Sequence, residues 1–335
     1  MSDKENYIIS PREKQLLDII QDDFPVVDRP FKIIGDKIDM SERDVIENIF
    51  TLTDNGIIRV FGPVFDPGRL GYVSTLGAAQ VETDRIAEVA AALLDITEIT
   101  HNYVRENELN MWFTVTARTQ AIKTRILSFV KSLPGVSTSV DFPTVTRYKI
   151  SAVFGSGAPT AIKGSDIKKP IPIDEHDIEL IRHIQRCFPV VERPFNLLAE
   201  TLDREEEDIH RTIASWMDNG TIRRFGARLN HRRSGYHHNS LVVWKGDSID
   251  TWGHEFARMP QVSHCYSRET SPLWPWELYT MLHCRTADEL TETINGMVEK
   301  ASGTEHLVLN TLYELKKTSM RYFEEENRWD SQNEE

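Results

Sequence analysis

Apolar positions along the chain follow a helical period first and a strand period later, and this order occurs twice. Residues 10–20 open with a capping box, Ser10 to Glu13, which is followed by an apolar stripe at helical spacing. Residues 174–184 repeat the pattern, with Asp174 as the cap and Asp177 three residues later. Each of these segments is therefore expected to be a helix with one buried face.

A short segment with two prolines follows each first helix and is almost identical in the two copies, FPVVDRPFKI at 24–33 and FPVVERPFNL at 188–197. Proline lacks an amide donor and restricts the residue before it, so the first helix must end there. A short helix and a third helix are expected next, the third beginning at Ser41 and at Asp203. The predicted buried residues of the third helices are Val45, Ile46, Ile49 and Phe50, and then Ile209, Ile213, Trp216 and Met217. An Asn-Gly pair ends each third helix before a short β wing, so each copy predicts a winged helix.

The remainder of each half reads strand, helix, strand, strand, helix, strand. These elements are expected at about 73–81, 84–95, 97–105, 110–117, 119–133 and 136–148, and again at about 238–245, 248–258, 261–269, 276–285, 287–301 and 305–316. Two βαβ units with a central hairpin are typical of a ferredoxin-like domain. The predicted fold class is α+β, a tandem duplication of a winged helix-turn-helix and a ferredoxin-like (βαββαβ) domain.

The expected domain boundaries follow from these patterns. They are 1–72 and 73–154 for the first winged helix and ferredoxin-like domain, 155–173 for a linker, 174–236 and 237–323 for the second pair, and 324–335 for an acidic, disordered tail. The motif HNYVR at 101–105 also recurs, as HCYSR at 264–268. A repeat of this extent predicts two homologous halves that pair within one chain, with further homo-oligomerisation left open.

Composition and charge favour a cytoplasmic protein that does not bind DNA. The 335 residues contain no apolar run near the roughly 20 that span a bilayer, and the first residues lack the apolar core of a signal peptide. Three cysteines without CxxC spacing predict neither disulfides nor a zinc site. The net charge is −13, and the third helices open with SERDVIEN and DREEEDIHR, which carry excess acid. A helix that enters a DNA groove needs Lys, Arg, Asn or Gln instead.

The winged helix, the segment GIIRVFGPVFDPGRLGY and the ferredoxin-like domain together resemble the Lrp/AsnC family of transcription regulators. A narrower resemblance rests on FPxxxRPF, on HNYVRENELNMWFTV at 101–115 and on HCYSRETSPLWPWELYTMLH at 264–283, which are similar to the sirohaem decarboxylases. That resemblance implies removal of two acetate carboxyl groups from sirohaem to give 12,18-didecarboxysirohaem, a haem or haem d1 precursor, by two fused Lrp-like halves. It implies a carboxy-lyase with a tetrapyrrole ligand and no cofactor beyond the iron that sirohaem carries.

Alternation along the strands predicts which side chains share a face. His101, Tyr103 and Arg105 are expected to point together, as are His264, Tyr266 and Arg268. On the neighbouring strand Tyr279 and His283 share a face. Such a hairpin is a poor core but a good anion site, because guanidinium forks suit carboxylates.

Roles for these residues follow from the chemistry that the resemblance implies. We predict His264 or His283 as the acid or as an axial ligand of the substrate iron, and Tyr266 and Tyr279 as orienting groups. The remaining predicted substrate-binding residues are His101, Tyr103, Arg105, Arg268, Trp274, Arg285, Lys316, Lys317 and Arg321. The prolines and arginines of FPVVxRPF are expected to brace the winged helix against the sheet. Two alternatives stay open: a DNA-binding regulator, and a haem-binding sensor or carrier without catalysis.

Overall fold

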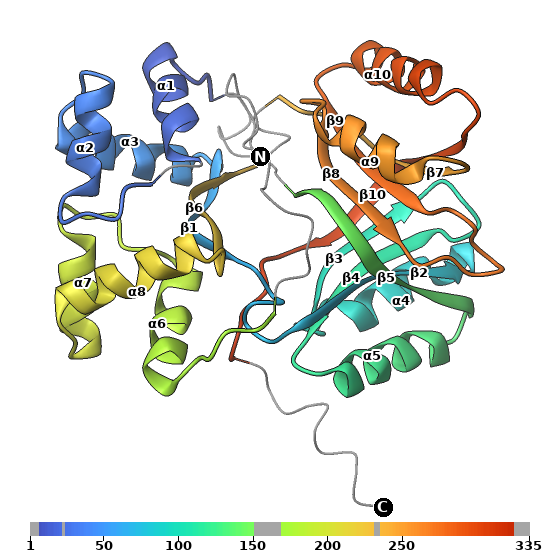
Figure 1. The fold of residues 1–335 in the computed structure, drawn as a ribbon, viewed down its shortest axis with the longest axis horizontal. Helices are drawn as coiled ribbons and strands as arrows, with labels where there is room; N and C mark the ends of the chain where they lie inside the picture. The colour runs from blue at the N-terminus through green and yellow to red at the C-terminus, as the bar shows by residue number, and fades with distance from the viewer. Residues whose placement is uncertain (1–6, 22–23, 151–168, 231–234, 325–335) are drawn as a thin grey trace, which may run out of the picture.

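The computed structural model describes residues 7–21, 24–150, 169–230 and 235–324. The winged-helix elements of both halves lie together on one side of the molecule, and the two sheets with their covering helices lie on the other (Figure 1). Residues 151–168, which include most of the predicted linker at 155–173, and residues 325–335 of the predicted tail fall outside the described residues.

The opening helix of each half is capped as its sequence predicts. In α1 (Pro11–Ile20) the Ser10 hydroxyl accepts the Glu13 N–H, and the Glu13 carboxylate accepts the Ser10 N–H. In α6 (Glu175–Arg186) Asp174 and Asp177 make the same reciprocal pair. These caps satisfy amides that a helix start leaves without partners.

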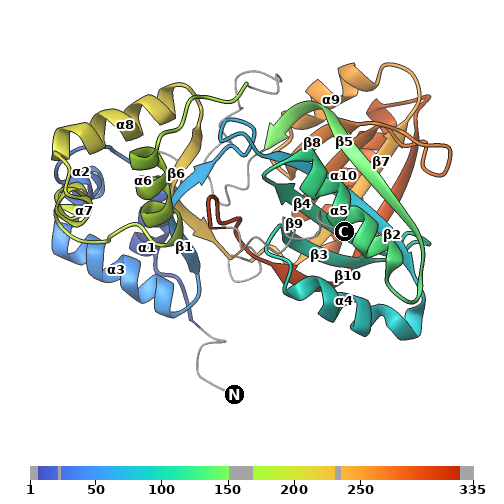
Figure 2. The same ribbon diagram turned by 90° about the horizontal axis from the view of Figure 1, so that it is seen from below.

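The two winged helices form one unit with one core. The remaining helices here are α2 (Pro30–Lys37), α3 (Glu42–Asp54), α7 (Pro194–Leu202) and α8 (Glu206–Asp218). The wing strands β1 (Ile58–Phe65) and β6 (Ile222–Leu229), labelled in Figure 2, pair antiparallel. Their register places Gly62 opposite Gly226. A Cβ on Gly226 would lie 2.0 Å from the carbonyl oxygen of Ile20, so only glycine allows this close approach between halves.

The repeated FPVVxRPF phrase joins the two winged helices. Phe24 donates its N–H to the carbonyl of Phe225, and Phe188 donates to that of Phe61, so each copy bonds to the wing of the other. The rings of Phe24 and Phe188 are also in contact, with centroids 5.4 Å apart. The prediction that this phrase braces the winged helix against the sheet is wrong: it braces one winged helix against the other.

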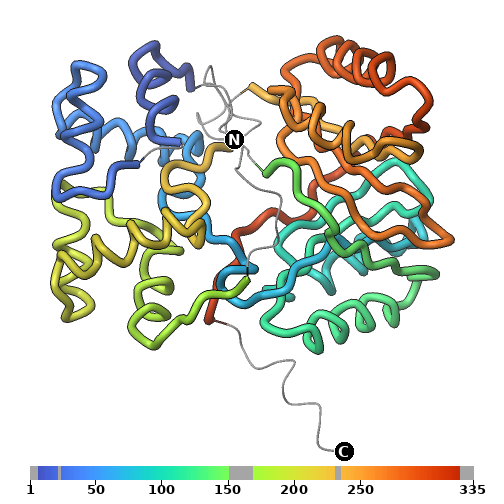
Figure 3. Tube along the Cα trace, viewed as in Figure 1, coloured from blue at the N-terminus to red at the C-terminus, as the bar shows by residue number. Residues whose placement is uncertain are grey.

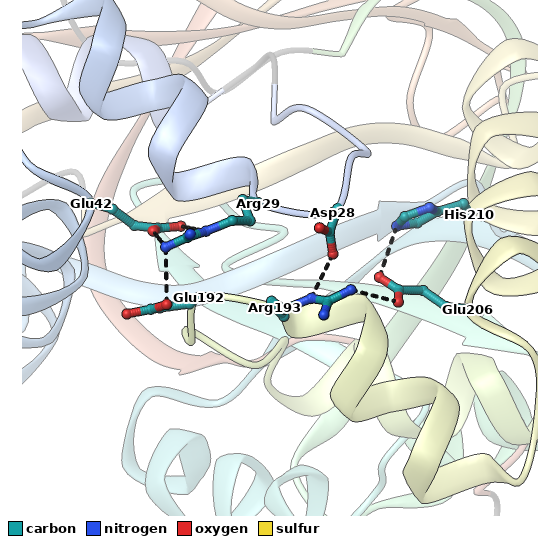
Figure 4. Close-up of polar contacts among 7 residues, drawn as sticks. All are labelled: Asp28, Arg29, Glu42, Glu192, Arg193, Glu206 and His210. Atoms are coloured by element: carbon teal, nitrogen blue, oxygen red, sulfur yellow. Dashed lines mark hydrogen bonds and ion pairs between the residues drawn. The ribbon is translucent and has the colours of Figure 1, made fainter.

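The charged residues of the phrase pair reciprocally across the same junction (Figure 4). Arg193 Nε lies 2.8 Å from Asp28 Oδ1, and Arg29 Nη2 lies 3.0 Å from Glu192 Oε2. Arg29 also pairs with Glu42 at the start of α3. The position that alternates between Asp and Glu in the two copies is acidic because it faces the arginine of the opposite copy.

The strands of both ferredoxin-like domains close into a single barrel, in the order β10-β3-β4-β2-β5-β8-β9-β7. Its first half contains β2 (Val73–Val81), the turn η2 (Thr83–Arg85), α4 (Ile86–Leu94), β3 (Ile99–Arg105), β4 (Met111–Ala117), α5 (Gln120–Ser132) and β5 (Val136–Ile150). Its second half contains β7 (His238–Lys245), α9 (Ile249–Ala257), β8 (Val262–Arg268), β9 (Leu278–Cys284), α10 (Ala287–Lys300) and β10 (Glu305–Lys317). Helices cover the outside (Figure 3).

Two long strands close the barrel by crossing between the halves. β5 pairs with β2 along its first part and with β8 of the other half along its second part. β10 likewise pairs with β7 and then with β3. Within each half the strand order is that of a ferredoxin-like sheet, which confirms the predicted fold class.

Several local expectations differ from the structure. Phe50 was expected to be buried and is 52% exposed, because the buried stripe of α3 runs through Val45, Ile49 and Leu52. The third helix of the second half begins at Glu206; Asp203 instead ends α7 in the left-handed conformation.

The end of the second ferredoxin-like domain also differs from its expected boundary. Tyr322 and Phe323, which the sequence analysis places in that domain, pack into the winged-helix core. Glu324, expected in the acidic tail, pairs with Arg186 of α6. The chain after β10 therefore returns to the winged-helix unit.

Candidate active site

A bulge in each half turns the histidine of the HxYxR motif toward the barrel interior. The pairing of β3 with β4 shifts between Ile99 and His101, and that of β8 with β9 shifts between Val262 and His264. Ile99 and Val262 pack on the helix side of their sheets. Because side chains alternate along a strand, the extra residue places each histidine on the opposite, inner face.

Beyond the bulges, the motif side chains form three successive layers in both halves. The rings of His101 and Tyr103 stack with centroids 6.2 Å apart, and those of His264 and Tyr266 stack at 6.3 Å. The guanidiniums follow, with Arg105 5.4 Å from the Tyr103 ring. Arg268 lies 4.9 Å from the Tyr266 ring and 5.4 Å from that of Tyr279. The predicted common faces are therefore present.

The histidine layer lies at the end of the barrel that faces the wings. In the strand pairing His101 is opposite Lys317, and His264 is opposite Ile150, at the final residues of β10 and β5. Arg105 and Arg268 are opposite Thr311 and Thr144, deeper in the barrel. Below them lies an apolar cluster shared by both halves, which includes Trp112, Phe142, Trp274, Tyr279 and Leu309.

One hydroxyl connects the two histidines of the second half. Ser263 Oγ lies 2.9 Å from His264 Nδ1, 3.0 Å from His283 Nδ1 and 3.1 Å from the carbonyl oxygen of Met281. A hydroxyl has one proton to donate and two lone pairs. All three contacts are satisfied when the serine donates to Met281 and accepts an Nδ1–H from each histidine. In this tautomer Nε2 is the unprotonated nitrogen of each imidazole.

The first half has a different arrangement at the corresponding positions. His101 Nδ1 lies 2.9 Å from the hydroxyl of Thr100, which in turn contacts the hydroxyl of Thr114 at 2.9 Å. The hydroxyl of Thr100 thus connects His101 to a threonine, where that of Ser263 connects His264 to a second histidine. The second half therefore has the richer set of proton-carrying groups.

Burial holds both motif histidines in the neutral form. Desolvation is the main cause that lowers the pKa of His264 to about 4, and nearby Arg223 and Lys317 lower it further. Desolvation likewise lowers the pKa of His101 to about 3, helped by Lys317, Arg59 and His264 itself. Lys317 lowers the pKa of both histidines, and it lies opposite His101 where β10 of the second half pairs with β3 of the first.

The wings contribute basic groups that sequence reasoning missed. Arg59 and Arg223 occupy corresponding positions in IIRVFG and TIRRFG, and they act on His101 and His264 respectively. Arg147 Nη1 is held 2.9 Å from Asp66 Oδ2, and both act on the pKa of Tyr266, which burial raises. The signal was available, because the wing arginine recurs in both copies.

Lys316 has a structural role in this arrangement. Its Nζ contacts the carbonyl oxygens of Leu93, Leu94 and Ile96 at 3.3, 2.6 and 2.7 Å, at the end of α4. The corresponding Lys149 contacts the Met259 carbonyl after α9 at 2.8 Å. An ammonium has three N–H groups, and Lys316 uses all of them, so this residue leaves the set of predicted substrate contacts.

The remaining candidates lie at different distances from the motif layers. Lys317 lies opposite His101 in the pairing of β10 with β3, and its charge lowers the pKa of both motif histidines. Trp274 is 5% exposed and packs against Trp112 in the apolar cluster, so the structure places it in the core. Arg285 lies 5.3 Å from the ring of Tyr236, and Arg321 is exposed near Glu324.

Two further observations concern membrane-spanning helices and metal sites. Among the described residues, no helix is long and apolar enough to cross a membrane. Within the same ranges, no cluster of three or more His, Cys, Asp or Glu side chains could hold a metal ion.

Fold and site together define a duplicated protein of the AsnC-like class, in which two helix-turn-helix and two AsnC-like units enclose one basic, histidine-containing site. Family models agree: an AsnC-like ligand binding domain matches residues 69–149 and 233–316. A siroheme decarboxylase NirDL-like HTH domain matches residues 13–59 and 177–223.

The most similar relatives carry one function in their names. The siroheme decarboxylase of Hydrogenobacter thermophilus is 32% identical over 324 residues, which is 94% of this chain and 96% of that protein. The siroheme decarboxylase NirDL subunit of Paracoccus denitrificans is 30% identical over 286 residues, 84% of this chain and 87% of that protein. A crystal structure of the siroheme decarboxylase NirDL with an iron-uroporphyrin III analogue matches with a TM-score of 0.72 and 26% identity, covering 95% and 97% of the two chains. This chain belongs to the siroheme decarboxylase family.

Proposed function

We propose that this protein is a carboxy-lyase that removes two acetate carboxyl groups from sirohaem without oxidation, giving 12,18-didecarboxysirohaem. The observation that carries the proposal is the basic site at the barrel end, where two HxYxR motifs and the wing arginines surround neutral histidines. Sirohaem has eight carboxylates, and an acidic protein needs such a local concentration of positive charge to bind it.

Each decarboxylation breaks one carbon–carbon bond, releases carbon dioxide and requires one proton at the carbon that remains. The electron pair of the broken bond passes into the macrocycle until that carbon is protonated. His264 and His283 are suited to supply the proton, because Ser263 fixes the Nδ1–H of each imidazole and thereby makes Nε2 the basic nitrogen that carries the proton. Carboxylates of a bound substrate raise the pKa of a nearby imidazole, so substrate binding favours protonation of the histidine.

The iron of sirohaem is part of the substrate, and the proposal includes no other cofactor. An unprotonated Nε2 is also a ligand for haem-type iron. Of the two histidines on Ser263, one delivers the proton and the other is available to the iron. Tyr266 keeps its proton because burial raises its pKa, and it can therefore donate a hydrogen bond to a substrate carboxylate.

Single replacements of His264 and His283 by alanine test these roles. We expect loss of turnover with retained tetrapyrrole binding for the proton donor, and an altered iron absorption spectrum for the ligand. His254→Ala is the matched control, because that histidine is 59% exposed on α9. Unchanged rates and spectra in both variants would contradict the assignment.

A non-catalytic haem sensor is the second candidate that the same site permits. It predicts a stable complex in which the mass of the tetrapyrrole does not change. A DNA-binding regulator is disfavoured by the start of α8, where Glu206, Glu207 and Asp208 occupy the first turn. Titration of duplex DNA at low salt checks this point, and salt-dependent binding in the micromolar range or tighter would revive the regulator.

A further inference from the structure

Two arginines in the barrel, one buried and one partly buried, form no ion pair within the described part of the chain. Arg105 is 5% exposed and Arg268 is partly buried, and among the described residues neither forms an ion pair with a carboxylate. Asp141, the acid that acts on Arg268, is itself paired with Lys123 at 2.9 Å. The Nε atoms of both arginines are buried without a hydrogen-bond partner. A buried cation in this condition is unfavourable, so an anion is expected to complete the site.

The surroundings fix the two guanidiniums in matching positions. Arg105 Nη1 donates to the Leu309 carbonyl at 3.1 Å and to the Thr311 hydroxyl at 2.9 Å. Arg268 Nη1 donates to the Phe142 carbonyl at 2.8 Å and to the Thr144 hydroxyl at 3.1 Å. Each arginine is thus held by the fourth strand of the opposite half, and the arrangement has an approximate two-fold axis.

Both guanidiniums also lie beside one strand. Arg105 Nη2 is 3.8 Å from the sulfur of Met281, and Arg268 lies over the ring of Tyr279, two residues away on the same face of β9. The pair is therefore close enough to meet one ligand from two sides. The histidines lie nearer the wings, four residues from the arginines along each strand, or about 13 Å at 3.3 Å per residue.

Sirohaem has a matching symmetry along one edge. The two acetates that leave are on neighbouring pyrrole rings, and each has a propionate beside it on its ring. A two-fold axis in the macrocycle plane, through the meso carbon between these rings, exchanges the two acetates and also the two propionates. A two-fold protein site can therefore treat both acetates alike from a single bound orientation.

Electrostatics decides which arms the arginines take. A guanidinium on a reacting carboxylate would stabilise the charge that must disappear, and this contact would be lost as carbon dioxide forms. A spectator propionate keeps its charge throughout, so an ion pair with it assists binding without opposing the reaction. Inserting the two propionates toward the arginines leaves the adjacent acetates in the tyrosine and histidine layers.

Building on the proposed function, we propose that Arg105 and Arg268 bind the two propionates that flank the reacting acetates. In this way the arginines select which edge of sirohaem enters the barrel. The other two acetates are on the remaining two rings, outside the edge that enters the barrel. The two arginines are thus positioning residues that determine which acetates leave.

Binding of two iron porphyrins to the full-length protein tests this inference without turnover. Iron-uroporphyrin III has both acetates and propionates, whereas iron-coproporphyrin III keeps the propionates and has methyl groups in place of the acetates. We expect Arg105→Gln and Arg268→Gln each to raise the Kd of both ligands by the same factor, about 10- to 100-fold for loss of a charge-assisted contact. Arg258→Gln, which removes an exposed charge on the half that contains Arg268, should leave the Kd of both iron porphyrins unchanged.

Each outcome has a defined meaning. Weaker binding of iron-uroporphyrin III alone would show that the arginines hold acetates, and unchanged binding of both ligands would show that they only brace the barrel; either result overturns the inference. Arg105→Lys and Arg268→Lys keep the positive charge but remove the planar guanidinium. These variants replace the glutamine variants in the same binding measurement if a glutamine variant fails to fold. Turnover of sirohaem by the unmodified protein is measured separately, so a failed proposed function is recognised by binding without decarboxylation.

Discussion

Replacement of Ser263 by alanine tests whether one hydroxyl organises the catalytic histidines. Ser263 is 5% exposed, and its Oγ makes three contacts of 2.9 to 3.1 Å with His264, His283 and Met281. The alanine leaves two Nδ1–H groups and one carbonyl without their partner. Neutral hydrogen bonds contribute about 1 kcal/mol each, so the free energy of unfolding should fall by about 1 to 3 kcal/mol.

The effect on catalysis should exceed this change in stability. Loss of a group that orients an active histidine typically lowers activity about 10- to 100-fold. We therefore expect the anaerobic rate of sirohaem decarboxylation to fall by that factor while the tetrapyrrole still binds. The assay is single-turnover mass analysis at saturating protein, which removes any difference in affinity.

The chain supplies its own control for this experiment. The first half has Thr100 at the position that corresponds to Ser263, and its hydroxyl contacts His101. Ser263→Thr should therefore keep most of the rate. The contrary result is a Ser263→Ala variant that loses stability as expected but decarboxylates sirohaem within about twofold of the unmodified rate. In that case the hydroxyl has only a structural role, and the tautomers that it fixes do not affect catalysis.

Three further predictions concern the fold and its titration. The pKa of His264 is about 4 in the folded protein and about 6.5 when unfolded, so the unfolded state binds more protons between these values. Stability should therefore fall as the pH is lowered from 6.5 toward 4, and His264→Gln should reduce this slope in denaturant titrations; an unchanged slope would show that other groups dominate. Gly226→Ala should lower the free energy of unfolding by roughly 1 to 3 kcal/mol or more, because the new Cβ would lie 2.0 Å from the carbonyl oxygen of Ile20. Gly62→Ala should lower it less, because its Cβ would lie 3.0 Å from the carbonyl oxygen of Ile184. Equal thermal shifts for the two glycine variants would argue against that contact. Lys316→Met should lower the thermal midpoint while leaving the Kd for iron-uroporphyrin III unchanged, and a raised Kd would return this lysine to the site.

Much of the fold was predictable because local patterns carry it. The capping boxes at Ser10 and Asp174 mark helix starts by their own chemistry, and the strands of both ferredoxin-like domains were placed to within a few residues. The common face of His101, Tyr103 and Arg105 followed from alternation alone. These features depend on residues that are near one another in sequence.

The features that were missed depend on contacts between the halves. Nothing local shows that FPVVxRPF meets its own second copy, because the partner of Asp28 is Arg193 and that of Arg29 is Glu192. The bulge before His264 is likewise set by pairing with β9. The role of Lys316 required knowledge of where α4 ends in space.

The measurement that tests the central claim most directly is anaerobic incubation of the purified protein with sirohaem, with the extracted tetrapyrrole followed by mass spectrometry over time. We predict successive loss of two carbon dioxide units from each tetrapyrrole. A tetrapyrrole that stays bound at its original mass would contradict decarboxylation by this protein and would favour a sensor or carrier.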